Sequence, residues 1–472
     1  MLDFLNQIIG TLNTWLWSYI LIVLLISLGL YFTVRSNFVQ FRFFGEMFKL
    51  LTEGATDALG QKKKDGVSSF QAFCISTASR VGTGNLAGVA IAVSLGGPGA
   101  VFWMWIIALI GAGSSFVEST LAQIYKVPDK HGYRGGPAYY MEKALNMRWM
   151  GIIFSILISI SFGLVFNSVQ ANTITFAFEQ AFSINRLYIG IIIAVCTALI
   201  IFGGIKRIAT VVEMIVPVMA IAYVLVAVFV LIKNVTLIPS LFSLIIGSAF
   251  GVKQAVAGGV GAALMQGIRR GLFSNEAGMG SAPNAAATAE VSHPVKQGLI
   301  QTLGVFTDTL LICSATAFIV ILSGAYKLTD VEGIQLTQMA LSSEVGAWAN
   351  TFVAVCILLF AFSSIVGNYY YGESNIEFIN GNKAWLFGYR VLVVLMVLFG
   401  SVSKIAIVWD MADLFMGLMA IINLIAISML GKIAFAALKD YTKQKKEGKD
   451  PVFHVSHIPG LKNVECWGKI ED

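Results

Sequence analysis

Apolar residues are grouped along this chain into eleven stretches that are long enough to cross a lipid bilayer. A transmembrane helix needs about 20 mostly apolar residues, because each residue rises about 1.5 Å through a hydrocarbon layer about 30 Å thick. The pattern therefore predicts an all-α integral membrane protein with eleven transmembrane helices. We expect these helices at residues 15–34, 70–95, 99–125, 150–176, 187–202, 208–232, 245–289, 297–322, 345–371, 385–399 and 405–429.

The composition of the chain is typical of an integral membrane protein. Of its 472 residues, 57% are hydrophobic and only 12% are charged, whereas soluble domains have about 25% charged residues. The net charge is +6, but the basic residues lie in short loops and in the tail, so membrane lipid rather than nucleic acid is the expected partner. The five cysteines have no paired spacing that would indicate a disulfide framework or a zinc site.

The distribution of Lys and Arg predicts an orientation, because short basic loops favour the cytoplasmic side. Four basic segments fall on one side of the eleven-helix pattern. They contain Arg35, Arg42, Lys49 and Lys62 to Lys64; Lys126, Lys130, Arg134, Lys143 and Arg148; Lys206 and Arg207; and the lysines of residues 432–449. We expect the N-terminus outside, the C-terminus in the cytoplasm, and a location in the cell (inner or plasma) membrane.

Two segments outside the predicted spans have weaker patterns. Four phenylalanines recur at helical spacing before the second span, at Phe38, Phe41, Phe44 and Phe48. This spacing fits either a helix in the membrane interface or a linker packed on the protein. The polar tail is expected to be mobile, and its three candidate metal ligands are weak evidence for a metal site: His454, His457 and Cys466.

Glycine and polar residues interrupt two of the predicted spans, at residues 79–88 (SRVGTGNLAG) and 269–278 (RRGLFSNEAG). Unwound backbone inside a membrane is tolerated only where it is buried in protein or lines a water-filled cavity, and such breaks are typical of transporter binding sites. Free N–H groups at half-helix N-termini suit a carboxylate, and free carbonyls suit Na⁺ or an ammonium group. A zwitterionic amino acid would satisfy both.

The two breaks also match each other at a constant offset of 190 residues. The offset pairs Arg80 with Arg270, Asn85 with Asn275, Ala87 with Ala277, Gly88 with Gly278, and Glu118 with Asp308. Such identities can arise by chance, but spans two and seven cross the membrane in opposite directions and each opens a set of five. This layout predicts a 5+5 inverted repeat with discontinuous helices two and seven. The expected parts are an additional N-terminal transmembrane helix with a cytoplasmic interfacial segment (1–67), two five-helix repeats (68–233 and 234–430) and a cytoplasmic tail (431–472).

The sequence around both breaks resembles one known family. VGTGNLAGVA at 81–90, GGPGAVFWMW at 96–105 and GLFSNEAGMGSAP at 271–283 resemble the alanine or glycine:cation symporter family, and so do shorter matches at 135–137, 169–172 and 370–373. The resemblance runs from about residue 70 to residue 430. It implies a leucine-transporter-type fold in which Na⁺ enters with a small neutral amino acid, with Na⁺ as the coupling ion and no cofactor.

The resemblance also implies site residues in this sequence. Substrate would contact Thr83, Gly84, Asn85, Gln170, Phe273, Ser274, Ser364 and Asn368. Sodium would be bound by Ser363 and Ser364 together with backbone carbonyls near Ser79 and Gly82. Family members commonly have Trp where this chain has Asn368, and an Asn would widen the pocket and add an amide that can pair with a polar substrate. Alanine and glycine are the family default, with glutamine or asparagine as the alternative.

Charged side chains within the membrane cost about 2.5 to 3.5 kcal/mol each, so they are functional candidates. We assign five of them to gating or structural roles: Arg80, Glu118, Arg270, Glu276 and Asp308. Glu276 could bind a cation or could brace the unwound backbone. The arginines, Arg269 included, are expected to pair with carboxylates such as Glu118, Glu276 or Asp308 rather than to contact substrate.

Other function classes fit the sequence less well. An ion channel would need a ring of carbonyls or charges, and the sequence contains no repeated filter motif. A membrane enzyme would need an acid, base or nucleophile cluster, and none stands out. A receptor or scaffold would leave the two broken helices unexplained. The sequence therefore favours a sodium-coupled symporter that works by alternating access.

Overall fold

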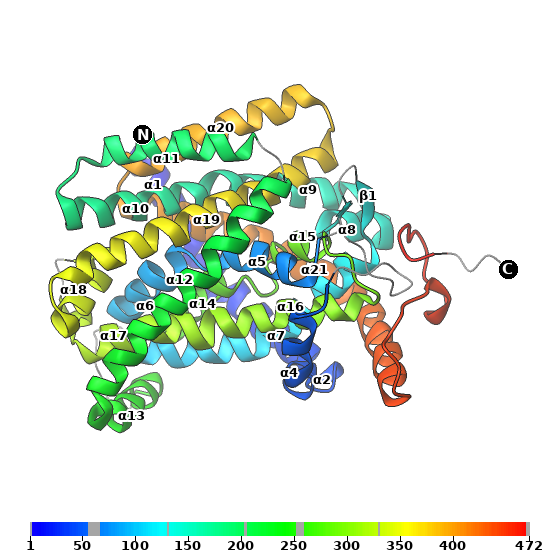
Figure 1. Cartoon of the computed structure of the whole chain (residues 1–472), viewed down its shortest axis with the longest axis horizontal. Helices are drawn as coiled ribbons and strands as arrows, with labels where there is room; N and C mark the ends of the chain where they lie inside the picture. The colour runs from blue at the N-terminus through cyan, green and yellow to red at the C-terminus, as the bar shows by residue number, and fades with distance from the viewer. Residues whose placement is uncertain are drawn as a thin grey trace.

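The protein is almost entirely helical in the computed structural model, which describes residues 2–54, 67–129, 132–202, 205–251, 259–328 and 331–468. Most of the long helices run roughly along the longest axis of the molecule (Figure 1). In this view α5 and α14 lie in the middle, with α10, α11, α19 and α20 on one side and α7 and α16 on the other. Lys62 to Lys64 and Lys130, which entered the prediction of orientation, lie outside the described residues, as do the side chains of Lys206 and Arg207.

The first half of the chain contains the N-terminal helix and one interrupted helix. Its elements are α1 (Leu2–Trp15), η1 (Leu16–Leu21), α2 (Ile22–Arg35), α3 (Val39–Arg42), α4 (Phe44–Leu51), α5 (Ser69–Arg80), η2 (Gly84–Gly88), α6 (Val89–Gly96), α7 (Gly99–Ile124), β1 (Val127–Asp129), β2 (Gly132–Arg134), α8 (Pro137–Leu145), α9 (Arg148–Ile158), η3 (Ser159–Phe166), α10 (Asn167–Phe182), α11 (Arg186–Ile201) and α12 (Ile205–Lys233). The two short strands form an antiparallel hairpin.

The second half contains the other interrupted helix and the longest helix of the chain. Its elements are η4 (Val235–Leu237), α13 (Ile238–Ala249), α14 (Gly259–Asn275), α15 (Ala282–Ala286), α16 (Pro294–Phe306), η5 (Thr307–Cys313), α17 (Ser314–Leu322), η6 (Ala325–Lys327), α18 (Ile334–Val345), α19 (Trp348–Ile379), α20 (Lys383–Val402), α21 (Ile405–Lys446) and η7 (Val455–His457).

Within the described residues, seven helices are long and apolar enough to cross a membrane. They are Gln7–Arg35, Gly99–Ile124, Arg148–Phe182, Pro294–Leu322, Trp348–Ile379, Lys383–Val402 and Ile405–Lys446, and all seven coincide with predicted spans. A bent pair, Pro217–Lys233 and Val235–Ala249, adds an eighth if it is counted as one span, with a bend of 78°. The protein is thus a multi-pass helical membrane protein, and the count of eleven stays a prediction.

The predicted seventh span and the position of its break are wrong. The predicted seventh span, 245–289, is divided, because α13 ends at Ala249 and a separate helix, α14, begins at Gly259. The helix then continues through Asn275, so the unwound segment is 276–281 rather than 269–278. The last predicted span, 405–429, is part of a longer helix, because α21 runs on to Lys446; the boundary of the cytoplasmic tail at residue 431 stays a prediction.

The tail itself is packed rather than mobile up to residue 468. Phe453 and Trp467 are buried. The Phe453 N–H donates to the Ser292 carbonyl at 2.9 Å, and Trp467 Nε1 donates to the Gln123 carbonyl at 2.8 Å. The polar composition of the tail did not predict this packing, because two buried aromatic side chains, Phe453 and Trp467, are enough to hold a polar segment against the helices.

The segment that follows α2 combines the two alternatives that its phenylalanines suggested. α4 buries Met47 and Leu50, and it exposes Phe44 and Phe48 on another face. Phe44 also contacts Phe306 of α16, with ring centroids 6.1 Å apart. The segment is therefore an amphipathic helix that packs on the protein and still presents aromatic side chains outward.

Candidate functional site

The first break separates α5 from η2 and is completely buried. Val81 adopts an extended conformation (φ −82°, ψ 95°), which ends α5 after Arg80. The Gly82 N–H donates to Asn85 Oδ1 at 2.9 Å, so the side chain of Asn85 connects the backbone of the break to the restarted helix. A Cβ at Gly82 would collide with Ser364 Oγ and lie 2.8 Å from Gln170 Oε1. Glycine is therefore required here for the close approach of α10 and α19 to the break.

The second break is held open by a carboxylate from another helix. Glu276, Gly278 and Gly280 have φ values of +57°, +84° and +88°, which carry the chain through a left-handed turn between α14 and α15. Glu118 of α7 accepts hydrogen bonds from the Gly278 N–H at 3.0 Å and the Gly280 N–H at 3.1 Å. Asn423 Nδ2 of α21 donates to the same carboxylate at 2.7 Å. Glu118 thus supplies the partners that the unwound backbone lacks.

The two breaks meet at Ser79 and Glu276. Ser79 Oγ lies 2.7 Å from Glu276 Oε1 and 2.7 Å from Asn368 Oδ1. Glu276 also accepts from Ser281 Oγ at 2.5 Å. The contacts of Glu276 are consistent with the bracing role considered for it, because they connect α5 to the segment that follows α14.

A second polar network connects Asp308 of η5 to both breaks. Asn85 Nδ2 donates to Asp308 Oδ1 at 2.6 Å. Ser274 Oγ donates to the same carboxylate, 2.8 Å from Oδ2. Thr309 Oγ1 lies 2.9 Å from Oδ2. Asp308 therefore joins the first break, the end of α14 and η5 in one buried cluster.

The remaining predicted substrate residues lie around the same region. Thr83 presents both its N–H and its hydroxyl to Gln170 Oε1, at 3.0 and 2.7 Å. Phe273 packs between Phe166 and Trp409, with ring centroids 4.6 and 4.8 Å away. A Cβ at Gly84 would lie 3.0 Å from the Phe273 ring, so these residues form a continuous surface.

Asn368 has an amide group that is only half used. Its Oδ1 faces Ser79, whereas Nδ2 is buried without a hydrogen-bond partner among the described residues. Such a group is costly unless something else pairs with it.

Oxygen atoms suitable for a hard cation converge near Ser364. Its Oγ lies 2.7 Å from the Ala78 carbonyl and 3.3 Å from the Val81 carbonyl. These carbonyls precede Ser79 and Gly82 by one residue each. Ser363 Oγ instead donates to the Phe360 carbonyl of its own helix at 2.8 Å.

The arginines do not pair as the sequence suggested. Arg270 forms an ion pair with Asp413 of α21, and Arg269 lies 3.3 Å from the same carboxylate. Asp413 was not singled out from the sequence, although a carboxylate inside the apolar run 405–429 was a usable signal. Asn423, the partner of Glu118, lies in the same run and was missed in the same way.

Arg80 is 2% exposed and makes no ion pair with a described residue. Its Nη1 donates to the Gln301 carbonyl at 3.2 Å, while Nε and Nη2 have no hydrogen-bond partner in the described part of the chain. The guanidinium nevertheless interacts electrostatically with Glu118, Glu276 and Asp308. Arg80 acts on the acidic residues of both breaks at longer range rather than through direct contact.

Comparison with known families gives the site a context. The model of the sodium:alanine symporter family matches residues 2–455 of the chain. The chain belongs to this family. Family and fold are those of transporters rather than enzymes, and the family implies Na⁺ as the coupling ion.

Individual relatives carry different substrate names. The chain is 60% identical to the "Probable sodium/glutamine symporter GlnT" of Bacillus subtilis, over 99% of this chain and 97% of that protein. It is 58% identical to the "Amino-acid carrier protein AlsT" of the same organism, over 99% and 98%. It is 35% identical to the "Sodium/alanine symporter AgcS" of Methanococcus maripaludis, over 95% and 100%.

Solved structures show the same fold at low sequence identity. MhsT in complex with L-phenylalanine aligns with a TM-score of 0.55 at 13% identity, over 80% of this chain and 96% of that one. This likeness establishes the leucine-transporter type of fold.

Proposed function

We propose that the protein is a symporter that uses an inward Na⁺ gradient to import a small neutral amino acid by alternating access, and that its preferred substrate has an amide side chain, as glutamine does. The observation that carries the proposal is the meeting of two buried helix breaks with the half-used amide of Asn368. Alanine or glycine is the second candidate, because the family description and relatives such as AgcS name alanine.

The substrate carboxylate would bind at the first break. Gln170 Oε1 accepts from both the N–H and the hydroxyl of Thr83, and a carboxylate oxygen is a stronger acceptor for the same two donors. Binding would then displace Gln170 toward the substrate. Gly84, Asn85, Phe273 and Ser274 would form the adjoining wall.

The substrate side chain would extend toward Asn368. A glutamine amide could accept from Asn368 Nδ2 with its oxygen and donate to an acidic oxygen with its nitrogen. Glu276 offers such an oxygen, because both it and Asn368 lie 2.7 Å from the same Ser79 hydroxyl. An alanine side chain would leave Nδ2 without a partner.

Sodium would bind between α5 and α19. Ser364 Oγ and the carbonyls of Ala78 and Val81 supply oxygens at the end of a helix, where carbonyl groups lack helical partners. The adjacent residues Ser79, Gly82 and Ser363 complete the proposed site. Since Gly82 lies against both Ser364 and Gln170, ion and substrate would act on the same piece of backbone.

One sodium ion is energetically sufficient. A tenfold Na⁺ gradient with a potential of about 100 mV supplies about 3.7 kcal/mol. That free energy supports roughly 500-fold accumulation of a neutral solute.

The order of helices supports the proposed inverted repeat. Each half begins with a broken helix and continues with four further helices. In the first half the broken helix is α5 and α6, and it is followed by α7, by α9 with α10, by α11 and by α12. In the second half the broken helix is α14 and α15, and it is followed by α16 with α17, by α19, by α20 and by α21. We assign the halves to residues 68–233 and 234–430, after an additional N-terminal segment, 1–67, and we retain the N-out, C-in orientation as part of the proposal. Arg80, Glu118, Arg270, Glu276 and Asp308 would hold or release the breaks as the two halves move.

The test is uptake of labelled glutamine, alanine and glycine by proteoliposomes, with and without an inward Na⁺ gradient. Saturable accumulation of glutamine that depends on Na⁺ is the expected result. Accumulation of alanine or glycine alone would support the second candidate. A Na⁺ current without saturable solute uptake would instead indicate a channel and would refute the symporter proposal.

A further inference from the structure

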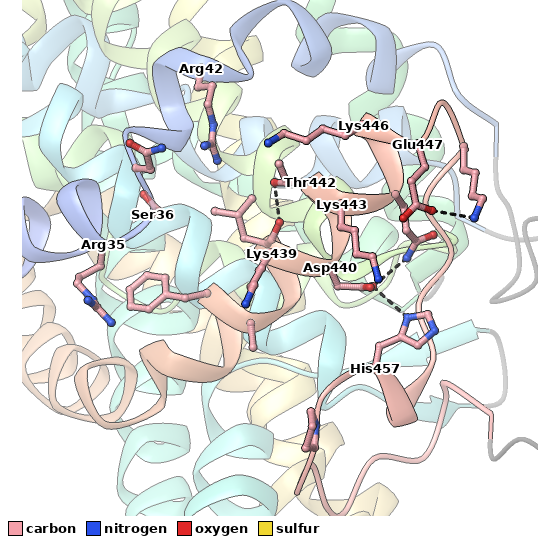
Figure 2. Close-up of a pocket in the computed structure, with 17 residues that line it drawn as sticks. Arg35, Ser36, Arg42, Lys439, Asp440, Thr442, Lys443, Lys446, Glu447 and His457 are labelled. Carbon is pink, nitrogen blue, oxygen red and sulfur yellow. Dashed lines mark hydrogen bonds and ion pairs between the residues drawn. The ribbon is translucent and has the colours of Figure 1, made fainter.

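A strongly basic cleft lies between the turn that follows α2 and the last turns of α21, and none of the residues of the two helix breaks line it (Figure 2). Its volume is about 1130 Å³. Residues 35–37 and 42 form one wall, α21 from Phe435 onward forms the other, and His457 and Pro459 of the tail close one end. The cleft is therefore built from three segments that are distant in sequence.

Cations outnumber anions in the lining. Apart from Lys449, which is paired with Glu447, five exposed side chains of the lining carry a positive charge, namely Arg35, Arg42, Lys439, Lys443 and Lys446. The lining contains two acidic residues. Asp440 is engaged by His457 at 3.1 Å and by His293 at 3.2 Å, and Glu447 is engaged by Lys449 at 2.8 Å.

The five cations make no ion pair with any described residue, unlike neighbouring cations. Lys445, on the same turn of α21, is paired with Glu46 at 2.6 Å. Arg35 lies over the ring of Phe435 and Arg42 over the ring of Phe43, so each has an aromatic neighbour in place of a carboxylate. Concentrating like charges in a concave site creates a positive potential that favours an anionic ligand.

The surface next to Asn37, a residue of the cleft lining, is apolar. Phe38 follows Asn37 directly and is 50% exposed. The last turns of α2 expose Tyr31 and Val34, which belong to an apolar span. The floor of the cleft includes Phe435 and Leu438. The cleft thus lies where an apolar span gives way to a polar helix end, at the level at which lipid headgroups lie.

The turn between α2 and α3 fixes this arrangement. Asn37 and Phe38 both have left-handed conformations, with φ values of +56° and +54°. This conformation is uncommon for a bulky residue such as phenylalanine. The turn places Arg35 and Arg42 in one wall of the cleft and leaves Phe38 exposed beside it.

We propose that this cleft binds an anionic phospholipid, with the lipid phosphate held by the arginines and lysines and the acyl chains lying along Phe38 and the exposed apolar side chains at the end of α2. A free phosphate would use the cations and leave the aromatic side chains without a role. An anionic lipid uses both, as basic clusters next to transmembrane helices do.

The test measures lipid retention by native mass spectrometry of the purified full chain in detergent. Phosphatidylglycerol and phosphatidylcholine with identical acyl chains are compared, so that the headgroup is the variable. The test variant is Lys439→Gln, Lys443→Gln and Lys446→Gln combined. The matched control changes three exposed lysines outside the cleft, Lys383→Gln, Lys404→Gln and Lys462→Gln, and so removes the same charge.

Each basic residue near an anionic surface contributes about a fivefold factor in affinity. We therefore expect the triple variant to lose its preference for phosphatidylglycerol by at least tenfold, while the control keeps that preference. Equal retention of both lipids by the unmodified protein would overturn the proposal. An equal loss in the control would also overturn it, because the effect would then come from net charge alone.

Two further measurements separate lipid from free anion and binding from misfolding. Inorganic phosphate at millimolar concentration should fail to displace phosphatidylglycerol, and full displacement would reduce the cleft to an anion site and refute the lipid assignment. Phe38→Asn should weaken retention about severalfold without unfolding, because asparagine tolerates the left-handed conformation better than phenylalanine. Unchanged thermal unfolding of every variant in lipid-free detergent is the control for folding.

Discussion

Removal of the Glu118 carboxylate should close or collapse the second helix break. Glu118→Ala would leave three buried N–H groups without their acceptor: the backbone N–H groups of Gly278 and Gly280 and one N–H of the Asn423 amide, whose Nδ2 also donates to the Gly278 carbonyl. A buried unsatisfied donor costs about 1 to 3 kcal/mol. Even at the lower end, the three together imply about 3 kcal/mol, which is a large share of the stability of a typical domain.

Glu118→Gln tests the same idea with almost the same shape. A glutamine side chain keeps one acceptor oxygen. Its NH₂ group, however, would replace the second carboxylate oxygen and would face a donor that this oxygen accepts from in the unmodified protein. We expect Glu118→Gln to be destabilised less than Glu118→Ala and to lose most transport. The smaller effect on stability follows because one of the two backbone N–H groups retains a partner.

The assay pairs unfolding with uptake. The midpoint of unfolding by sodium dodecyl sulfate in mixed micelles reports stability, and the initial rate of Na⁺-driven uptake in proteoliposomes reports function. Asn423→Ala and the double variant with Glu118→Ala complete a double-mutant cycle. Because the two side chains are in contact, their effects should be less than additive by 0.5 kcal/mol or more, on the order seen for contacting residues.

Two results would refute this reasoning about Glu118. The first is wild-type stability of Glu118→Ala, which would mean that the backbone of residues 276–281 finds other partners. The second is strict additivity with Asn423→Ala, which would mean that the contact between the two side chains carries no free energy.

Three further predictions use other parts of the molecule. Asn368→Trp should lower glutamine uptake at least tenfold while alanine uptake remains, because it removes the free Nδ2 group that the glutamine amide is proposed to bind. An unchanged ratio of the two uptakes would remove Asn368 from the specificity site. Ser364→Ala should raise the Na⁺ concentration for half-maximal uptake at least tenfold, because an interaction with a charged group contributes about 1.5 to 3 kcal/mol. The control is Ser428→Ala, which should leave that concentration unchanged because the Ser428 hydroxyl is hydrogen-bonded within its own helix. Trp467→Ala should accelerate maleimide labelling of Cys466 in a Cys196→Ala background. Burial raises the pKa of the Cys466 thiol to about 11, and release of the tail would restore the ordinary reactivity of this thiol. Labelling at the unmodified rate would show that the tail stays docked without Trp467.

Hydrophobic periodicity predicted the parts of the fold that depend on the lipid. Span length is set by bilayer thickness, so seven apolar runs coincide with observed helices, although some helices are longer than the run and α21 continues to Lys446. The same reasoning misplaced the second break, because the polar run that begins at Arg269 looks like a helix end. In the structure Arg269 and Arg270 remain helical, since Asp413 of another helix neutralises them. A long-range partner of this kind cannot be read from local sequence.

The candidate site also divides into features with a local sequence signal and features that depend on long-range partners. Gly82 and Asn85 were noticed because a run of glycine and polar residues that interrupts an apolar span is a local signal. The hydrogen bond from the Gly82 N–H to Asn85 Oδ1 was not predicted. Glu118 was noticed only as a buried charge, and its role needed the position of residues 278 and 280, some 160 residues away in sequence. The ordered tail was missed because polar composition says nothing about where two aromatic anchors dock.

The charge distribution around the breaks gives a physical reason for coupling ion and substrate in the proposed mechanism. Glu118, Glu276 and Asp308 all lie within the electrostatic reach of Arg80, so one guanidinium serves three acidic side chains. A cation that binds between α5 and α19 would add positive charge beside this group and would stabilise the ionised acids. The same ion would fix the backbone at Gly82, which lies against Gln170, and would thereby prepare the donors of Thr83 for a carboxylate. Substrate affinity should therefore rise with Na⁺ concentration, and by linkage Na⁺ affinity should rise with substrate by the same factor.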